Sequence, residues 1–169
     1  VYVADTDNDR VQVFSASGGF LRKSGSTGSG DGQFLSAQDV AVDAQGGVWV
    51  ADYRNGRVQK FASGGGFQES IPSDQPTGVA VDADGNLYVL ELSGRLTRYD
   101  KASGYAARKS FKAAGKGGDV EVDSEGNILA ADPGGLKVTR YDSEGKAKGT
   151  MRGGLSAPHG RARHRRRCG

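Results

Sequence analysis

The sequence predicts an all-β protein built from repeated four-stranded antiparallel sheets. Short runs in which apolar and polar residues alternate are separated by turns of Asp, Asn and Gly, which is typical of strand hairpins and not of helices. Similar groups of runs recur, and the aspartate that follows the first run stands at Asp43, Asp82 and Asp123, in steps of 39 and 41 residues. A period near 40 residues with several strands in each repeat favours the blades of a β-propeller.

The first repeat begins inside a blade. We expect its second, third and fourth strands at residues 1–5, 10–14 and 19–23, so that its first strand is missing. The chain also starts without a methionine or a signal peptide, and we interpret it as a fragment or a processed product. Residues 25–38 form a connection rich in Gly and Ser that we expect to be flexible, with Phe34 and Leu35 as its apolar anchors.

The later blades follow at regular intervals, at about 38–69, 77–110 and 118–150, with the start of a fifth at 155–160. Together with the first blade at about 1–24 they form a propeller fragment over residues 1–160, followed by a basic disordered tail at 161–169. In each blade the first strand is small and apolar, as a crowded central channel requires, and the fourth is polar, as expected of an outer edge. We expect no helix between Val40 and Tyr141.

Two ring geometries are compatible with this count. Six blades of about 40 residues need about 240 residues, so the chain is about two blades short and the missing blades belong to the rest of the parent chain. Alternatively, the segment from Pro158 supplies the first strand of the blade that begins at Val1 and closes a four-bladed ring. The arginines that follow Pro158 argue against this second geometry, because burying them in a channel is unfavourable.

Two turn signatures recur in the repeats. After the first strand, Asp43, Asp82 and Asp123 are each followed three residues later by a glycine. The glycine permits a positive φ and the aspartate can accept hydrogen bonds from the amides of its own turn, so we predict a structural role for these acids. A calcium loop needs further spaced carboxylates that are not present here.

The second signature is an acid that closes the second strand and a base that opens the third. It occurs at Asp5 and Arg10, Asp52 and Arg57, Glu91 and Arg95, and Asp132 and Lys137. We expect an exposed ion pair across each hairpin, worth about 0.2–1 kcal/mol. The alternative is that these bases face a ligand.

The net charge of +3 is misleading, because five of the 23 basic residues are arginines in the last nine positions. Without them, residues 1–160 hold 18 basic and 20 acidic residues, a net charge of −2 that gives no general affinity for nucleic acid. No run of about 18 apolar residues is present that could span a membrane. The single cysteine, Cys168, excludes an internal disulfide and does not reveal the compartment.

The repeat motifs resemble those of a known family. Residues 76–82 (PTGVAVD), 1–5 (VYVAD) and 55–61 (NGRVQKF) are similar to the three parts of the NHL repeat, a family of six-bladed β-propellers. Residues 30–34 (GDGQF) resemble the usual lead into a blade of that family. The sequence departs from the pattern at residues 37–39, Glu91-Leu92, Gly117 and Asp119, which affects single turns. The resemblance slightly favours an extracytoplasmic or secreted protein, since NHL-type propellers include sensor domains of bacterial kinases.

The same family includes lyases of the peptidyl-hydroxyglycine and streptogramin types, which resemble one another in having rim histidines around a metal. This chain has two histidines, His159 at a blade rim and His164 in the arginine tail. A catalytic zinc needs about three protein ligands, so we predict no catalytic set, no metal and no cofactor in this chain. The glycine runs at 64–66 and 117–118 lack the context of a phosphate loop, and we predict hairpin turns there.

We therefore predict a non-enzymatic binding module that presents loops to a protein or glycan partner. The alternatives are a fragment of a metal-dependent propeller lyase and an RNA-binding propeller; interleaved acids near the basic hairpins make nucleic acid the less favoured partner. The predicted partner-binding residues are polar and lie on the loops between second and third strands or on the blade rims: Asp7, Asn8, Gln38, Tyr53, Arg54, Asn55, Thr77, Ser93 and His159.

Overall fold

The computed structural model describes residues 1–152 except 107 and 114. It contains fifteen strands and three single turns of 3-10 helix. In chain order the elements are β1 (Tyr2–Asp5), η1 (Thr6–Asn8), β2 (Arg10–Phe14), β3 (Phe20–Ser24), β4 (Ala37–Val42), β5 (Val48–Asp52), η2 (Tyr53–Asn55), β6 (Arg57–Phe61), β7 (Phe67–Pro72), β8 (Pro76–Val81), β9 (Leu87–Glu91), β10 (Arg95–Tyr99), η3 (Lys101–Ser103), β11 (Arg108–Lys112), β12 (Val120–Val122), β13 (Ile128–Asp132), β14 (Lys137–Tyr141) and β15 (Ala147–Arg152).

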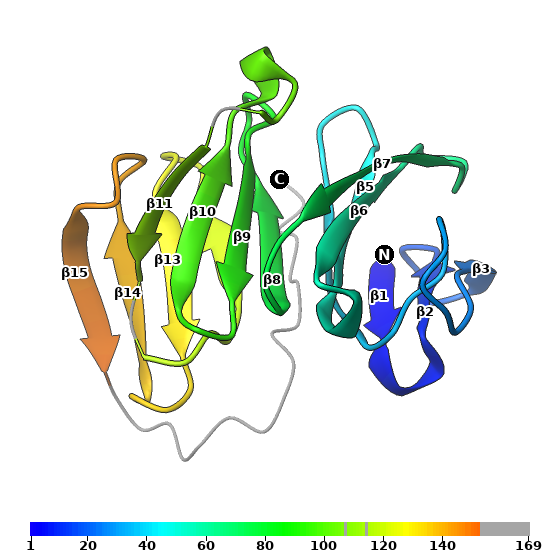
Figure 1. Cartoon of the computed structure of the whole chain (residues 1–169), viewed down its shortest axis with the longest axis horizontal. Coiled ribbons are helices and arrows are strands. Elements are labelled where there is room, and N and C mark those ends of the chain that lie inside the picture. Colours follow the sequence, from blue (N-terminus) through cyan, green and yellow to red (C-terminus); the bar gives the residue numbers. More distant parts are fainter. Residues whose placement is uncertain (107, 114, 153–169) are drawn as a thin grey trace.

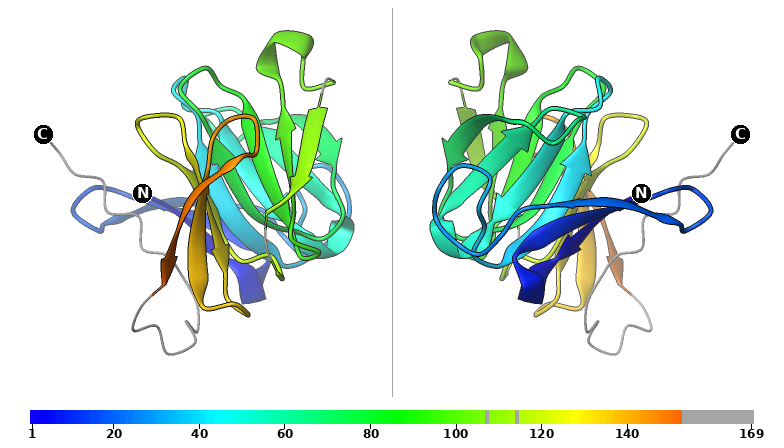
Figure 2. Two further views of the ribbon diagram at one scale, coloured as in Figure 1. Left: turned by 90° about the vertical axis from the view of Figure 1, so that its left-hand side faces the viewer. Right: turned by 90° about the vertical axis from the view of Figure 1, so that its right-hand side faces the viewer.

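The strands form four antiparallel sheets, each a simple meander. The first has three strands in the order β1-β2-β3, and the others have four each, β4 to β7, β8 to β11 and β12 to β15. Figure 1 shows the sheets side by side in chain order, and Figure 2 shows their twist from two sides. The inner strands are neighbours, because β4 contacts β1 and β8, and β8 contacts β12. This is the arrangement of propeller blades, and the prediction of an all-β propeller is confirmed.

The apolar core lies between successive sheets and not within one of them. The joint between the second and third sheets buries Trp49 and Val58 from one side and Leu87, Val89 and Tyr99 from the other. Because side chains alternate along a strand, the intervening residues of β9 point the opposite way, into the joint with the fourth sheet. Every residue of β5 and β9 is therefore buried, which agrees with the apolar character of these two runs.

The turn signature after the first strand has the predicted structural role. Asp43 Oδ1 accepts hydrogen bonds from the backbone N–H of Gln45 and Gly47, at 3.0 and 2.7 Å. Asp82 and Asp123 bind their own turns in the same way. The glycine three residues after each acid adopts the positive φ that this turn requires, as at Gly46 with a φ of 81°.

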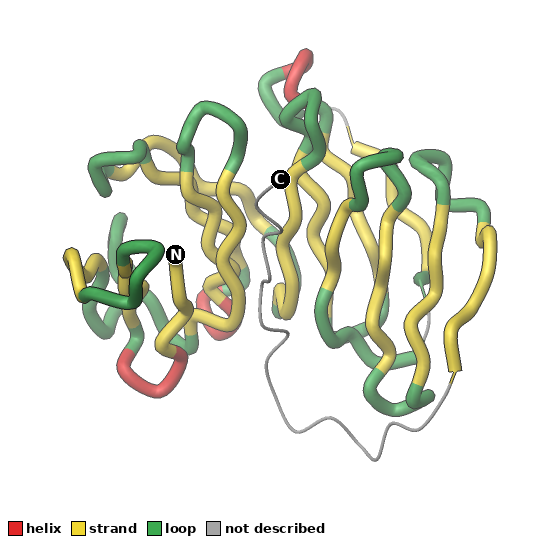
Figure 3. Tube along the Cα trace, turned by 180° about the vertical axis from the view of Figure 1, so that it is seen from behind, coloured by secondary structure: helices red, strands yellow, loops and turns green. Residues whose placement is uncertain are grey.

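Two expectations about the turns between strands are wrong. The strict absence of helix between Val40 and Tyr141 fails, because η2 and η3 are each one turn of 3-10 helix closed by a glycine with left-handed φ, Gly56 or Gly104. Figure 3 shows all three turns in connections outside the sheets, where they leave the strand pattern intact. Gly117 and Gly118 do not form a hairpin turn; they lie in the connection between β11 and β12.

The outer strands β7, β11 and β15 extend two or three residues beyond the expected ends, because each pairs with the full length of its neighbour; Arg57, for example, lies opposite Pro72. The connection before β4, expected to be flexible, is held by hydrogen bonds that are described below. The expected fifth-blade start at 155–160, the tail at 161–169 and the ring-closing strand from Pro158 lie outside the described residues.

Candidate binding face and inter-blade groove

The acid that closes the second strand organises each hairpin, and Asp52 shows this most completely. Its carboxylate is fully buried and accepts hydrogen bonds from Arg57 Nε at 2.7 Å and from Gln59 Nε2 at 3.1 Å. It also accepts from the side-chain amide of Asn55, within the hairpin loop, and from the backbone N–H of Leu35 at 2.9 Å. One carboxylate thus joins a loop, a strand and the connection that leads into the blade.

The other predicted hairpin pairs are present. Arg10 Nε lies 2.6 Å from Asp5, Arg95 Nε lies 2.7 Å from Glu91, and Lys137 Nζ lies 3.7 Å from Asp132. The hydrogen bonds from Asn8 and Arg10 lower the pKa of Asp5, and the bonds to Glu91 raise the pKa of Arg95.

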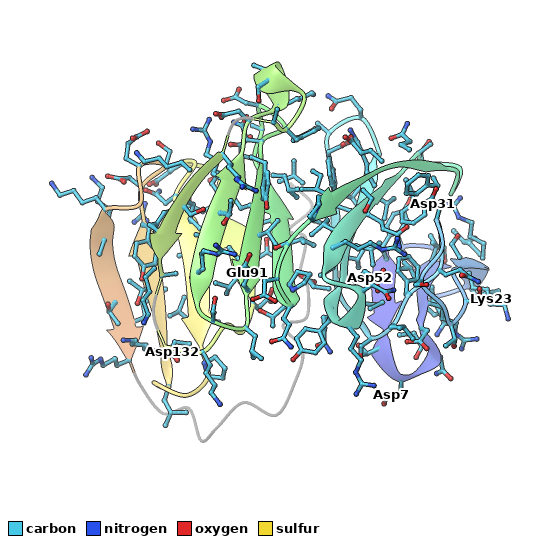
Figure 4. All side chains as sticks on the ribbon, viewed as in Figure 1. Asp7, Lys23, Asp31, Asp52, Glu91 and Asp132 are labelled. Carbon is cyan, nitrogen blue, oxygen red and sulfur yellow. The ribbon has the colours of Figure 1, made fainter. Side chains whose placement is uncertain are left out.

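The expected exposure of these pairs is wrong, because Glu91 and Asp132 are only 2% and 4% exposed. Figure 4 labels Asp52, Glu91 and Asp132, one in each of three neighbouring sheets. These acids are structural centres and not exposed partners of a ligand.

The connection before β4 is bound along the second blade. Arg57 Nη2 donates to the carbonyl oxygens of Gly30 and Gln33, at 2.7 and 3.0 Å. Gln59 donates from Nε2 to the Gln33 carbonyl and accepts from the Gly32 N–H, at 2.7 and 2.9 Å. Phe34, predicted as an anchor, is 1% exposed and packs edge-on against Phe61. The expected flexibility of a Gly and Ser segment is therefore overridden by side-chain bonds to its backbone.

On the second blade this connection fills the space beside the third strand, whereas the corresponding space beside the third blade is open. A groove with a cavity volume of about 600 Å³ lies between the end of the second sheet and the third sheet. Its third-sheet wall is formed by Arg95, Thr97 and Tyr99 on β10 and by Arg108 and Ser110 on β11. Thr97 Oγ1 and Ser110 Oγ share a hydrogen bond at 2.9 Å, and the Tyr99 hydroxyl donates to the Pro72 carbonyl. This groove was not among the sites predicted from the sequence.

Several predicted partner-binding residues gather around the start of β4. The Thr6 hydroxyl donates to the Ala37 carbonyl at 2.8 Å, which brings the η1 turn, with Asp7 and Asn8, beside Gln38. The backbone N–H of Tyr53 and that of Arg54 donate to the carbonyl oxygens of residues 36 and 35. We call Asp7, Gln38 and Arg54 the hairpin face. All three are exposed and make no side-chain hydrogen bond or ion pair with the described residues.

The remaining predicted residues are placed differently. The amides of Asn8 and Asn55 are bound to the acids of their own hairpins, Asp5 and Asp52. The Thr77 hydroxyl donates to the Leu90 carbonyl, and Ser93 is exposed in the β9–β10 turn, so both belong to the third blade.

His159, the last of the predicted site residues, lies outside the described residues.

A small group of acids lies on the inner strands. Asp39 precedes the small residues of β4, and its Oδ2 accepts the Val79 N–H of the next blade at 2.8 Å. Desolvation and the nearby Asp119 raise the pKa of Asp39 to about 8, against the two backbone hydrogen bonds that it accepts. Asp39 thus ties two inner strands together. Within residues 1–152, apart from 107 and 114, no group of three or more His, Cys, Asp or Glu side chains is arranged to hold a metal ion.

The described part of the chain contains no helix of the length and apolarity that crossing a membrane requires.

The four stacked sheets define a β-propeller module. Residues 34–61 match the NHL repeat family, so the chain carries an NHL repeat, and the matched residues cover the lead-in Phe34 and the strands β4, β5 and β6 of the second blade. The resemblance read from the sequence is thereby confirmed. A comparison with curated proteins finds no match.

Solved structures with a similar fold include proteins of more than one class. The chain matches a nidogen/laminin complex structure with a TM-score of 0.73 and 16% identity, covering 90% of this chain and 59% of that one. It matches a streptogramin B lyase with a TM-score of 0.68 and 14% identity, covering 92% and 52%. It also matches a catalytically inactive virginiamycin B lyase from Staphylococcus aureus, solved with quinupristin, with a TM-score of 0.67 and 12% identity, covering 93% and 52%. The chain spans about half the length of these three proteins. At these identities the likeness shows the fold alone.

Proposed function

We propose that this chain is a non-catalytic binding module that engages a protein partner through the hairpin face. The observation that carries the proposal is the position of Asp7, Gln38 and Arg54, three exposed polar side chains on η1, β4 and η2, which hydrogen bonds join to one another. A fixed frame presents such side chains at little entropic cost to binding, because the loops are already ordered. The solved nidogen/laminin complex, a similar fold, supports a protein over a glycan as the partner.

The test compares two triple variants in affinity capture followed by mass spectrometry. The first variant replaces Asp7, Gln38 and Arg54 with alanine, and leaves Asn55 in place because its amide binds Asp52 and the Gly28 carbonyl. The matched control replaces Lys23, Gln68 and Asp84, an equivalent set of exposed base, amide and acid, with alanine.

Both variants should keep the thermal stability of the parent chain, since surface changes of this kind alter stability by about 0.5 kcal/mol or less. We expect the parent chain and the control to retain the same proteins, and the hairpin-face variant to lose them. Equal retention by all three chains would show that the hairpin face is not the binding surface.

A further inference from the structure

The joint between the first and second blades and the joint between the second and third blades have the same arrangement of residues. Gln59 and Thr97 occupy the same place on the third strand of their sheets, opposite Val50 and Val89. By the same pairing Phe61 corresponds to Tyr99, and the Asp52–Arg57 pair corresponds to the Glu91–Arg95 pair. Each joint therefore presents a base, a polar residue and an aromatic ring in a row along the third strand.

The last two residues of the two connections also correspond. Ser36 and Gln75 both have positive φ, 63° and 46°, and their carbonyl oxygens accept the first N–H of the neighbouring hairpin loop. One residue earlier, the N–H of Leu35 donates to Asp52 and the N–H of Asp74 donates to Glu91. The entry into both blades is the same.

The connections differ in length before this shared entry. Residues 25–36 connect β3 to β4, whereas residues 73–75 alone connect β7 to β8. The third blade therefore has no counterpart of residues 25–33, the segment that Arg57 and Gln59 bind on the second blade. The groove of about 600 Å³ lies in the place of that segment, and its volume is within the range of about 300–1,000 Å³ that is common for ligand sites.

The segment that covers the joint before the second blade shows which ligand geometry this surface fits. Residues 30–33 form a turn closed by a hydrogen bond from the Gln33 N–H to the Gly30 carbonyl, at 3.1 Å. Gly32, the third residue of the turn, has a φ of 77°, which glycine adopts without strain. Its carbonyl-rich outer side faces Arg57 and Gln59. A turn of this kind offers backbone acceptors to the bases and hydroxyls of the third strand.

We propose that the groove beside Arg95, Thr97 and Tyr99 binds a glycine-containing turn of a partner polypeptide, in the manner in which the second blade binds residues 28–34 of its own chain. The groove wall carries Arg95 and Arg108 against Glu91 and Asp74, so its formal charge is balanced and suits an uncharged backbone better than a phosphate chain. This site is separate from the hairpin face, and the inference stands independently of the function proposed above.

The test uses the full chain and a fluorescein-labelled peptide with the sequence of residues 28–34, GSGDGQF, in fluorescence polarisation. The peptide should bind, and the Thr97→Gln variant should bind about five-fold more tightly, because its amide can bind the turn as Gln59 does and a gain of one neutral hydrogen bond over the threonine is worth about 1 kcal/mol. Ser110→Trp, which fills the groove from an exposed position, should weaken binding at least ten-fold. Its control is Thr150→Trp, at the equivalent position of the fourth blade.

Substitutions within the peptide provide a second test of the proposal. Replacing its third glycine, which corresponds to Gly32, with L-alanine should weaken binding, and D-alanine should preserve it, because only the D-residue adopts positive φ without strain.

Absence of binding to both the parent chain and Thr97→Gln, or binding that Ser110→Trp leaves unchanged, would overturn the proposal. The proposal would also be overturned if sedimentation velocity showed self-association of the chain that the peptide reverses. The groove would then be occupied by a second copy of this chain and not by a separate partner.

Discussion

Replacing Asp52 with alanine tests the role given to the hairpin acids most severely. The buried carboxylate accepts bonds from three neutral donors, the Leu35 N–H and the amides of Asn55 and Gln59, and from the Arg57 guanidinium. Each neutral bond contributes about 0.5–1.5 kcal/mol and the charged one about 1.5–3 kcal/mol. Allowing for water that reaches some of the freed donors, we expect Asp52→Ala to lower the free energy of unfolding by about 3–5 kcal/mol, the loss typical of a buried ion pair that is broken on one side.

The measurement is urea unfolding followed by far-UV circular dichroism, with the slope of the transition compared between variants. Asp84→Ala is the matched control, because Asp84 is an exposed acid that makes no side-chain bond with the described residues. The control should stay within about 0.5 kcal/mol of the parent chain. If Asp52→Ala lost less than about 1 kcal/mol, the hairpin acids would not be structural centres, and the plan shared by the two joints would lose its basis.

Three further changes probe other parts of the fold by the same unfolding assay. Phe34→Ala should cost about 3–5 kcal/mol because the ring is 1% exposed, whereas Phe20→Ala, at 57% exposure, should cost far less; equal losses would refute the anchor role. Gly117→Ala should destabilise the chain by about 1–3 kcal/mol, since the new Cβ would clash with the Glu91 carbonyl oxygen, while Gly149→Ala, with no atom within 4 Å, should not. The folded-state pKa of Asp39, about 8, lies above its unfolded value of about 4, so the folded chain binds the proton more tightly and stability should fall as pH rises between these values. A pH profile that Asp39→Asn does not flatten would contradict this assignment.

The parts of the fold that were predictable are those carried by local patterns. Alternation in runs such as residues 10–14 identifies the strands, and the Asp-to-Gly turn identifies the hairpin, because each depends on residues close in sequence. The acid-to-base pairing of Asp52 and Arg57 was visible for the same reason. Their burial was not, because it depends on a neighbouring sheet that no local pattern reveals.

The candidate groove was not predicted because it results from a comparison between two connections. Glycine and serine in residues 25–33 indicate flexibility, and nothing in their side chains shows that Arg57 and Gln59 bind their backbone carbonyls. A signal was nevertheless present. The connection into the second blade is nine residues longer than that into the third, and such a difference between repeats predicts a covered joint in one and an open joint in the other.

Residues 25–36 form a fixed part of the second blade, and amide hydrogen exchange of the full chain, measured by NMR, tests this rigidity. The N–H groups of Gly32 and Leu35 are bonded to Gln59 and Asp52. They should therefore exchange far more slowly than the same groups in a free peptide of residues 25–36. Exchange of both amides at the rate of the free peptide would contradict the account.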